Sequence, residues 1–302
     1  MKKIRMAFFA LAILALLATS TACGGGGGGG SDDDGSSSTS IPAGFVAVPG
    51  ATFDGTTAIT GSYVFITERT VTIPNLLVCD HEVTQGEYEQ YCSYGGSSPS
   101  TTFGKGSSYP AYCVSWYDAL VYCNKRSLAE GRTPCYKING ETNPSEWGTV
   151  PTYSNSPWNS ATCDFAANGY RLPTQAEWEY LIRGGNLTNS GQTTYSGSND
   201  IEAVAWYEGN SGSETHEVKK KAANALGLYD MSGNVYEWGW DWADSISTST
   251  PSAGAASGSH RVLRGGGWSS DASWCAVSHL GDNSPSVRSS YSGFRVVCSR
   301  SE

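Results

Sequence analysis

The segment that says most about the architecture of this chain covers residues 227–238 and reads Gly227-Leu228-Tyr229-Asp230-Met231-Ser232-Gly233-Asn234-Val235-Tyr236-Glu237-Trp238. Five shorter segments accompany it in a fixed order. They are His81–Thr84 (HEVT), Val114–Ala119 (VSWYDA), Arg171–Tyr180 (RLPTQAEWEY), Arg264–Gly266 (RGG) and Gly293–Arg295 (GFR). Each alone is a weak signal, but six in register along one chain exclude coincidence.

Together the six segments resemble the successive signatures of the formylglycine-generating enzymes and their sulfatase-modifying-factor relatives. The resemblance covers nearly all of the chain from about residue 41 onward. It implies an α+β domain with the C-type lectin fold of the formylglycine-generating-enzyme type, in which regular secondary structure is sparse.

Three helix starts can be located from the residues alone. In each, a hydroxyl residue stands three positions before a carboxylate: Thr84 before Glu87, Ser115 before Asp118, and Thr174 before Glu177. This spacing satisfies free amide groups at a helix N-terminus reciprocally. Gly131 and Gly184 suit the ends of the second and third helices. Four runs are strand-like: Tyr63–Ile66, Val71–Ile73, Arg261–Leu263 and Phe294–Cys298.

The N-terminus has the pattern of a bacterial lipoprotein. Basic residues precede an apolar run from Met6 to Ala18, which is too short to span a bilayer as a helix. Small residues then lead to Cys23, although Ser20 departs from the usual leucine of a lipobox. We therefore expect a signal peptide over 1–22, acylation of Cys23, a flexible Gly/Ser/Asp tether over 23–40 and one folded domain over 41–302. The alternative is ordinary cleavage after Ala22.

Charge limits the classes of partner. The formal net charge is −9, and Lys219–Lys221 is the one run of three basic residues. This balance argues against nucleic acid and against direct adhesion to anionic lipid, so membrane attachment is expected through the acyl anchor only. The expected location is the outer membrane or cell surface, with a periplasm-facing domain as the alternative.

Cys23 aside, eight cysteines remain: Cys79, Cys92, Cys113, Cys123, Cys135, Cys163, Cys275 and Cys298. An even number permits disulfides in an exported chain, but their connectivity stays open. The histidines are His81, His216, His260 and His279. They are scattered without metal-ligand spacing, which favours surface or hydrogen-bonded roles.

The 227–238 segment also suggests a structural calcium site. The carboxylates of Asp230 and Glu237 alternate with the carbonyls of Gly233 and Val235 around a tight turn, and Ca²⁺ takes six to eight such oxygens. The matching positions bind calcium in the family that the chain resembles. The alternative is that the carboxylates only cap turns.

The resemblance does not carry the family's copper chemistry with it. Formylglycine-generating enzymes hold copper between two thiolates five residues apart, and the matching positions here are Ser270 and Cys275. Gly267 replaces the serine of the associated motif. Because soft Cu(I) needs both sulfurs, no copper is expected. An exported oxidase or protein-modifying enzyme is the alternative function.

Residues 268–292 have the composition of a binding face. Small polar and aromatic residues dominate, as in antibody paratopes. The candidate ligand-binding residues are Ser269, Ser270, Asp271, Ser273, Trp274, Ser278, His279, Leu280, Asp282, Asn283, Ser284, Ser289, Ser290 and Tyr291.

The same segment resembles the C-terminal variable region of proteins diversified by retroelements, most closely the variable lipoproteins of treponemes. That resemblance implies a lipid-anchored receptor for an unknown protein or surface ligand, with a diversified binding face. The alternative is a solvent-exposed loop of an ordinary family member.

Overall fold

The computed structural model describes residues 41–300. The predicted signal peptide, Cys23 and tether therefore lie outside the described residues. Within them, no helix combines the length and apolar character needed to cross a membrane.

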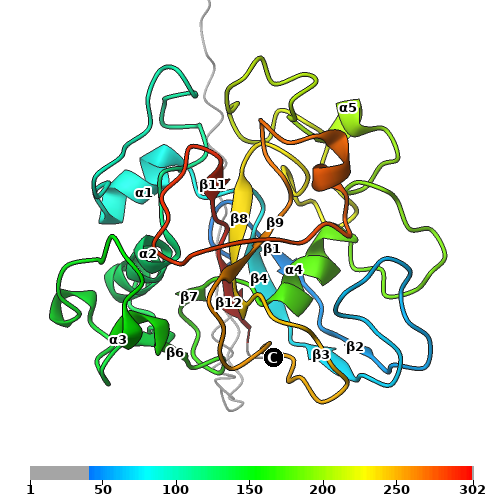
Figure 1. The fold of residues 1–302 in the computed structure, drawn as a ribbon, viewed down its shortest axis with the longest axis horizontal. Helices are drawn as coiled ribbons and strands as arrows, with labels where there is room; N and C mark the ends of the chain where they lie inside the picture. Colours follow the sequence, from blue (N-terminus) through cyan, green and yellow to red (C-terminus); the bar gives the residue numbers. More distant parts are fainter. Residues whose placement is uncertain (1–40, 301–302) are drawn as a thin grey trace, which may run out of the picture. The chain divides into compact units, whose positions relative to one another are not determined.

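Two four-stranded sheets form the centre of the domain (Figure 1). The first has the order β1-β4-β12-β7 and consists of β1 (Phe45–Val48), β4 (Leu76–Cys79), β12 (Val297–Ser299) and β7 (Tyr170–Arg171). The second has the order β10-β9-β8-β11 and consists of β10 (Gly281–Asn283), β9 (Arg261–Arg264), β8 (Tyr236–Trp242) and β11 (Ser292–Gly293). Two small hairpin-like sheets pair β2 (Ala51–Phe53) with β3 (Val71–Ile73) and β5 (Tyr136–Lys137) with β6 (Thr162–Cys163).

The three predicted helix starts are confirmed. Thr84, Ser115 and Thr174 each form the complete reciprocal cap, and they begin α1 (Gln85–Tyr91), α2 (Trp116–Ala129) and α4 (Gln175–Ile182). Gly131 and Gly184 follow α2 and α4 with φ of 68° and 65°, a region that favours glycine. The remaining helical turns are α3 (Ser156–Asn159), α5 (Ile201–Val204), η1 (Pro144–Glu146) and η2 (Ala272–Cys275).

The core lies on both sides of the first sheet. On one side, Phe294 and Trp238 pack with α2, and the Trp238 indole donates to the carbonyl of Val114 at 3.0 Å. On the other, Trp178 of α4 packs with Val297. Buried tryptophans supply large apolar areas while their N–H groups still find acceptors. The sparse regular structure is thus compensated by aromatic packing.

Two strand predictions need correction. Residues Tyr63–Ile66 form a loop, because Ser62 accepts hydrogen bonds from the amides of Val64 and Phe65 and bends the chain. The run Phe294–Cys298 begins before its strand, since β12 starts at Val297. The strands at Val71–Ile73 and Arg261–Leu263 are confirmed.

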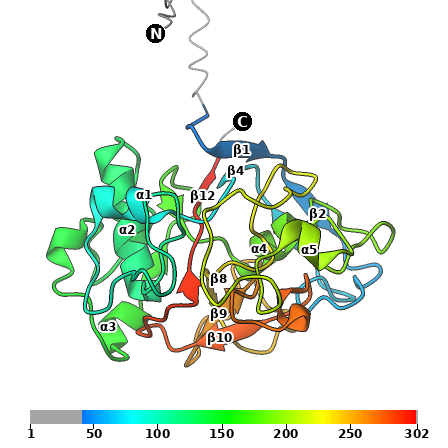
Figure 2. The ribbon, with the colours of Figure 1, turned by 90° about the horizontal axis from the view of Figure 1, so that it is seen from above.

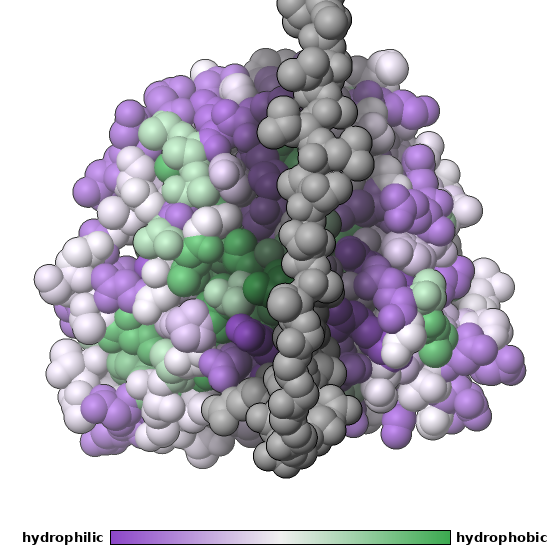
Figure 3. Space-filling view, turned by 180° about the vertical axis from the view of Figure 1, so that it is seen from behind, coloured by the Kyte–Doolittle hydropathy of each residue, from purple (hydrophilic) through white to green (hydrophobic). Residues whose placement is uncertain are grey.

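Both ends of the described chain lie in the first sheet, because β1 and β12 flank β4. The second sheet holds β10, which Figure 2 shows on the opposite side from β1 and the C-terminus. On the face opposite to Figure 1, hydrophilic and hydrophobic residues intermix, with hydrophobic residues gathered near the middle (Figure 3). All eight cysteines of the described residues are free thiols.

Candidate binding face and buried acidic cluster

Residues Ser269–Tyr291, the terminal segment, run between two buried frames. The frames are Arg264–Trp268 and Gly293–Arg295, and every residue in them is buried. The Arg264 guanidinium pairs with Glu179 of α4 at 3.1 Å and also donates to the carbonyls of His279 and Val277, at 2.6 and 3.1 Å. One buried arginine therefore fixes the path of the terminal segment over the core.

Close approach fixes the segment at two further points. At Gly266, φ is 72° and an added Cβ would lie 2.7 Å from the Cys275 sulfur, so only glycine fits. The Trp268 ring stacks on Phe103 at 5.3 Å, and its indole donates to the carbonyl of Ser290 at 3.0 Å. The segment is thus tied to the core near both of its ends.

A pocket of about 350 Å³ opens between these ties. Eight of the fourteen predicted binding residues line it: Ser269, Ser270, Trp274, His279, Leu280, Asp282, Asn283 and Tyr291. Tyr236, Leu263 and Gly281 complete the lining. The structure therefore brings most of the predicted set together in one concave site, of the size that ligand pockets have.

The other six predicted residues lie elsewhere. Asp271 and Ser273 are exposed beside the pocket. Ser278 lines a neighbouring pocket with Gln192 and Asn199. Ser284, Ser289 and Ser290 are half-buried, and the carbonyl of Ser289 accepts from the amide of Cys113 at 2.8 Å. These three serines support the loop.

Aromatic rings form the pocket wall. Trp274 and His279 stack in parallel, with centroids 5.6 Å apart and planes 4° apart. The Tyr236 hydroxyl lies 3.3 Å from Nε2 of His279. Trp274 remains 49% exposed and Tyr291 36%, so both offer apolar area to a ligand. Burial, together with the positive charge of Arg264, lowers the pKa of His279, which favours a neutral ring at neutral pH.

The sequence did not predict three of the pocket residues: Gly281, which lies within the terminal segment, and Tyr236 and Leu263, which lie outside it. Tyr236 was included only in the 227–238 motif, and Leu263 only in a strand-like run. They reach the pocket because β9 pairs with both β8 and β10, with Leu263 opposite Gly281. Strand pairing is the signal that would have found them, and one sequence does not reveal it.

The two positions that match the copper ligands are both buried. The Ser270 hydroxyl accepts from the amide of Gly267 at 3.0 Å, and Cys275 has no exposed surface. Burial raises the pKa of the Cys275 thiol to about 12, which favours the protonated form. A metal would need the thiolate. The expectation of no copper stays a prediction, and it rests on the hydroxyl of Ser270 in place of a second thiolate.

The predicted calcium ligands lie in a buried acidic cluster. Oδ2 of Asp230 accepts from the amide of Lys219 at 2.7 Å. The Glu237 carboxylate accepts from Arg295 at 2.6 and 2.7 Å and from the Trp178 indole at 2.7 Å. A cation at the four predicted ligands would therefore compete with Arg295 for Glu237.

A third carboxylate joins this cluster. Glu82 is fully buried and accepts from the Asn234 side chain at 2.7 Å and the Val235 amide at 3.0 Å. Burial raises the pKa of Asp230 to about 6, and repulsion from Glu237 adds to the rise. Burial also raises the pKa of Glu82 well above its usual value, and repulsion from Asp230 and Glu237 adds to it. Three carboxyl groups face one arginine here, so either protonation of Glu82 or an oxygen-seeking divalent cation would balance their charge. Glu82 and Arg295 were missed, although both stand in quoted motifs.

One further group has metal-ligating side chains. Atoms of Cys79, His81 and Glu87 lie within 4.8 Å of one another. However, His81 bonds Asp80 at 2.5 Å and pairs with Glu87 at 3.3 Å. Although burial opposes protonation, bonds to Asp80, Cys79 and Glu87 outweigh it and raise the pKa of His81 to about 12. The imidazolium thus links two carboxylates, as expected for a hydrogen-bonded histidine.

Comparisons with known proteins identify the family and the fold of this chain. Residues 33–300 match the family described as the sulfatase-modifying factor enzyme 1-like domain. Treponema denticola variable protein 1 superimposes with a TM-score of 0.72 and 36% identity, over 85% of this chain and 95% of that one. A chaperone protein from Paenibacillus barcinonensis, LppX, is 36% identical over 77% of this chain and 83% of its own length. The formylglycine-generating enzyme of Streptomyces coelicolor is 34% identical, over 46% of this chain and 50% of its own. The predicted α+β fold of the C-type lectin type is confirmed.

Proposed function

The chain belongs to the sulfatase-modifying factor enzyme 1-like domain family, and we propose that it uses this scaffold to bind a protein or surface ligand through the terminal segment. The observation that carries the proposal is the pocket that gathers eight predicted residues between two buried frames. Exposed Trp274 and Tyr291 supply the aromatic contacts that dominate binding energies at interfaces.

The position of the pocket suits display. Residue 41 enters the domain at β1, and the pocket borders β10 on the opposite side (Figure 2). The pocket therefore lies on the side of the domain away from residue 41, where a partner can reach it. The negative net charge gives no support to nucleic acid as the partner.

The enzymatic alternative rests on the formylglycine-generating enzymes, of which the mouse enzyme is 27% identical over 76% of this chain and the Streptomyces coelicolor enzyme 34% identical over 46%. The treponemal and Paenibacillus relatives are 36% identical over 85% and 77% of this chain, and they are not named for an enzymatic activity. Incubating the purified chain with copper and a cysteine-containing sulfatase peptide tests this choice. Conversion of the peptide cysteine to formylglycine would overturn the binding proposal.

The proposal includes lipid anchoring at Cys23. Each acyl methylene that is buried in the membrane would contribute about 0.8 kcal/mol to attachment. Labelled palmitate should enter the wild-type chain and not a Cys23→Ala variant, which should fractionate as soluble. Absence of label in the wild type would refute the anchor. Protease treatment of intact cells then separates a surface-exposed domain from a periplasm-facing one.

Diversification of the terminal segment is proposed on the likeness to the treponemal variable protein. Deep sequencing of the gene from a cell population should find substitutions concentrated between codons 268 and 292, at adenine positions. Substitutions spread evenly over the gene would contradict diversification and would indicate a binding site of fixed sequence.

A further inference from the structure

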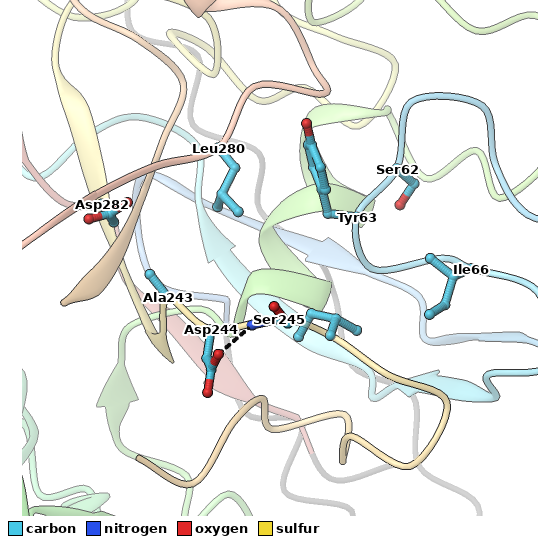
Figure 4. A pocket seen from close by; sticks show the side chains of 9 residues that line it. Ser62, Tyr63, Ile66, Ala243, Asp244, Ser245, Leu280 and Asp282 are labelled. Carbon is cyan, nitrogen blue, oxygen red and sulfur yellow. Dashed lines mark hydrogen bonds between the residues drawn. The ribbon is translucent and has the colours of Figure 1, made fainter. Parts of the chain in front are cut away.

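A second pocket adjoins the one lined by the terminal segment. Its volume is about 550 Å³, and the two pockets share Leu280 and Asp282. The rest of its lining comes from two loops outside the terminal segment, residues 62–66 and 243–246. In Figure 4, Tyr63 and Ile66 lie on one side of this space, and Asp244 and Asp282 lie on the other. The two pockets are therefore neighbouring parts of one surface.

The loop at residues 62–66 presents Tyr63 in a defined position. The Ser62 hydroxyl accepts from the amides of Val64 and Phe65, at 3.0 and 2.8 Å. Val64 and Phe65 are then buried in the core, at 1% and 0% exposure, whereas Tyr63 between Ser62 and Val64 is 57% exposed. Because its neighbours are anchored, the Tyr63 ring is held at the pocket edge as an available aromatic face.

The opposite wall is negatively charged. Asp244 accepts from the amide of Ser245 at 2.7 Å, and Asp282 accepts from His260 at 2.6 Å. Both bonds are made by Oδ1, which leaves Oδ2 of each carboxylate available to a ligand. The described lining residues include these two acids and no lysine or arginine, and His260, which pairs with Asp282, carries a charge only when it is protonated. A positively charged group would therefore be favoured in this space.

We propose that this second pocket is a fixed subsite that receives an arginine or lysine side chain of a protein partner. The cation would lie between the carboxylates of Asp244 and Asp282 and near the Tyr63 ring, which attracts cations through its electron-rich face. Leu280, Ile66 and Ile246 would contact the aliphatic stem, since long basic side chains pack their methylenes on apolar surface. The inference rests on the proposed function only in taking the partner to be a protein.

Single amino-acid probes test the subsite without knowledge of the partner. Binding of Nα-acetyl-arginine methylamide to the full chain can be measured by saturation-transfer difference NMR, with the neutral norleucine analogue in parallel. The arginine probe should bind more tightly than the norleucine probe. Tyr63→Leu and Asp244→Asn should each weaken it by about two- to fivefold, the range expected for exposed cation–aromatic and ion-pair contacts.

Matched controls come from exposed residues outside the pocket. Tyr153 is 68% exposed and Asp164, which like Asp244 accepts from a nearby backbone amide, is also exposed, so Tyr153→Leu and Asp164→Asn should leave binding unchanged. Equal affinity for the two probes would overturn the subsite, as would arginine binding that neither pocket substitution weakens. Because the probes are free amino-acid derivatives, either result is independent of whether the terminal segment is diversified or binds a ligand.

Discussion

The frames and the terminal segment are neighbours in sequence but differ in their exposure to solvent. Every frame residue is buried, whereas Ser269, Asp271, Ser273, Trp274, Asp282 and Tyr291 are exposed. The frames contain Arg264 and Arg295, which pair with the buried acids Glu179 and Glu237. The segment contains one short helical turn and one three-residue strand. The chain thus separates residues that define the fold from residues that face solvent.

Two kinds of constraint explain why the frames leave so little room for change. An added Cβ at Gly293 would lie 2.4 Å from the carbonyl oxygen of Ala111, which no side chain tolerates. Removing one partner of a buried ion pair leaves an uncompensated charge in the core. Neither constraint applies to an exposed serine or aspartate of the segment.

The largest expected effect is on a frame aromatic. Phe294 is fully buried between Tyr88 and Tyr122, and Phe294→Ala should destabilise the domain by about 3 to 5 kcal/mol because it leaves a cavity. Tyr291 lies three residues earlier and is 36% exposed, so Tyr291→Ala should cost about 1 kcal/mol or less. Denaturant titration measures both. Similar losses for the two variants would remove the distinction between frame and segment.

A second expected effect is a pH dependence confined to the core. Asp241 on β8 is buried, and burial raises its pKa to about 7, with Glu177 adding repulsion while Arg261 and Arg69 oppose the rise. The folded state therefore holds a proton that the unfolded state has released. Stability should fall as pH rises from about 4 to 7, by on the order of 2 to 4 kcal/mol for this group.

Asp241→Asn tests that dependence, because the asparagine oxygen can still accept from the amide of Gln175 as Asp241 does at 2.7 Å. Unfolding free energies of wild type and variant should converge at low pH and diverge toward pH 7, with the variant more stable. A constant difference across that range would show that Asp241 does not titrate in it. As a control, Asp271→Asn removes the same charge from an exposed position and should change stability by no more than about 0.5 kcal/mol.

The buried acidic cluster predicts a smaller effect of calcium. A cation that binds only the folded state stabilises it by mass action. At a free concentration of ten times the dissociation constant, it raises the free energy of unfolding by about 1.4 kcal/mol. Calcium added after prolonged dialysis against chelator should therefore raise the melting temperature of the wild type. Asp230→Asn keeps an acceptor for the Lys219 amide but removes a charge, and it should abolish the rise. A melting temperature indifferent to calcium would end the calcium proposal.

Local signals in the sequence predicted local structure well. The three capping boxes involve only residues three positions apart, and each begins a helix where expected. The loop at Tyr63–Ile66 was missed because an apolar run looks alike in a strand and in a turn with buried side chains. There, hydrogen bonds from Ser62 rather than the pattern of apolar residues determine the outcome.

Long-range pairing accounts for most of what the sequence did not reveal. The composition of residues 268–292 indicated a binding face, but Tyr236 and Leu263 reach the pocket only through pairing of β8, β9 and β10. Likewise, Glu82 meets Asp230 and Glu237 from a position about 150 residues away. Such contacts depend on topology, which periodicity and composition do not encode for a single chain.

The most direct test of the separation between fold and recognition is a display experiment. Ser269, Asp271, Ser273, Trp274, Asp282 and Tyr291 are randomised together, and one sorting experiment measures the fraction of chains that stay folded and the fraction that bind a chosen purified protein. Most members should remain folded, because exposed substitutions contribute within about ±0.5 kcal/mol each. Binders should be enriched over a control library of exposed residues around Tyr153. Widespread unfolding, or enrichment no better than the control, would contradict the account.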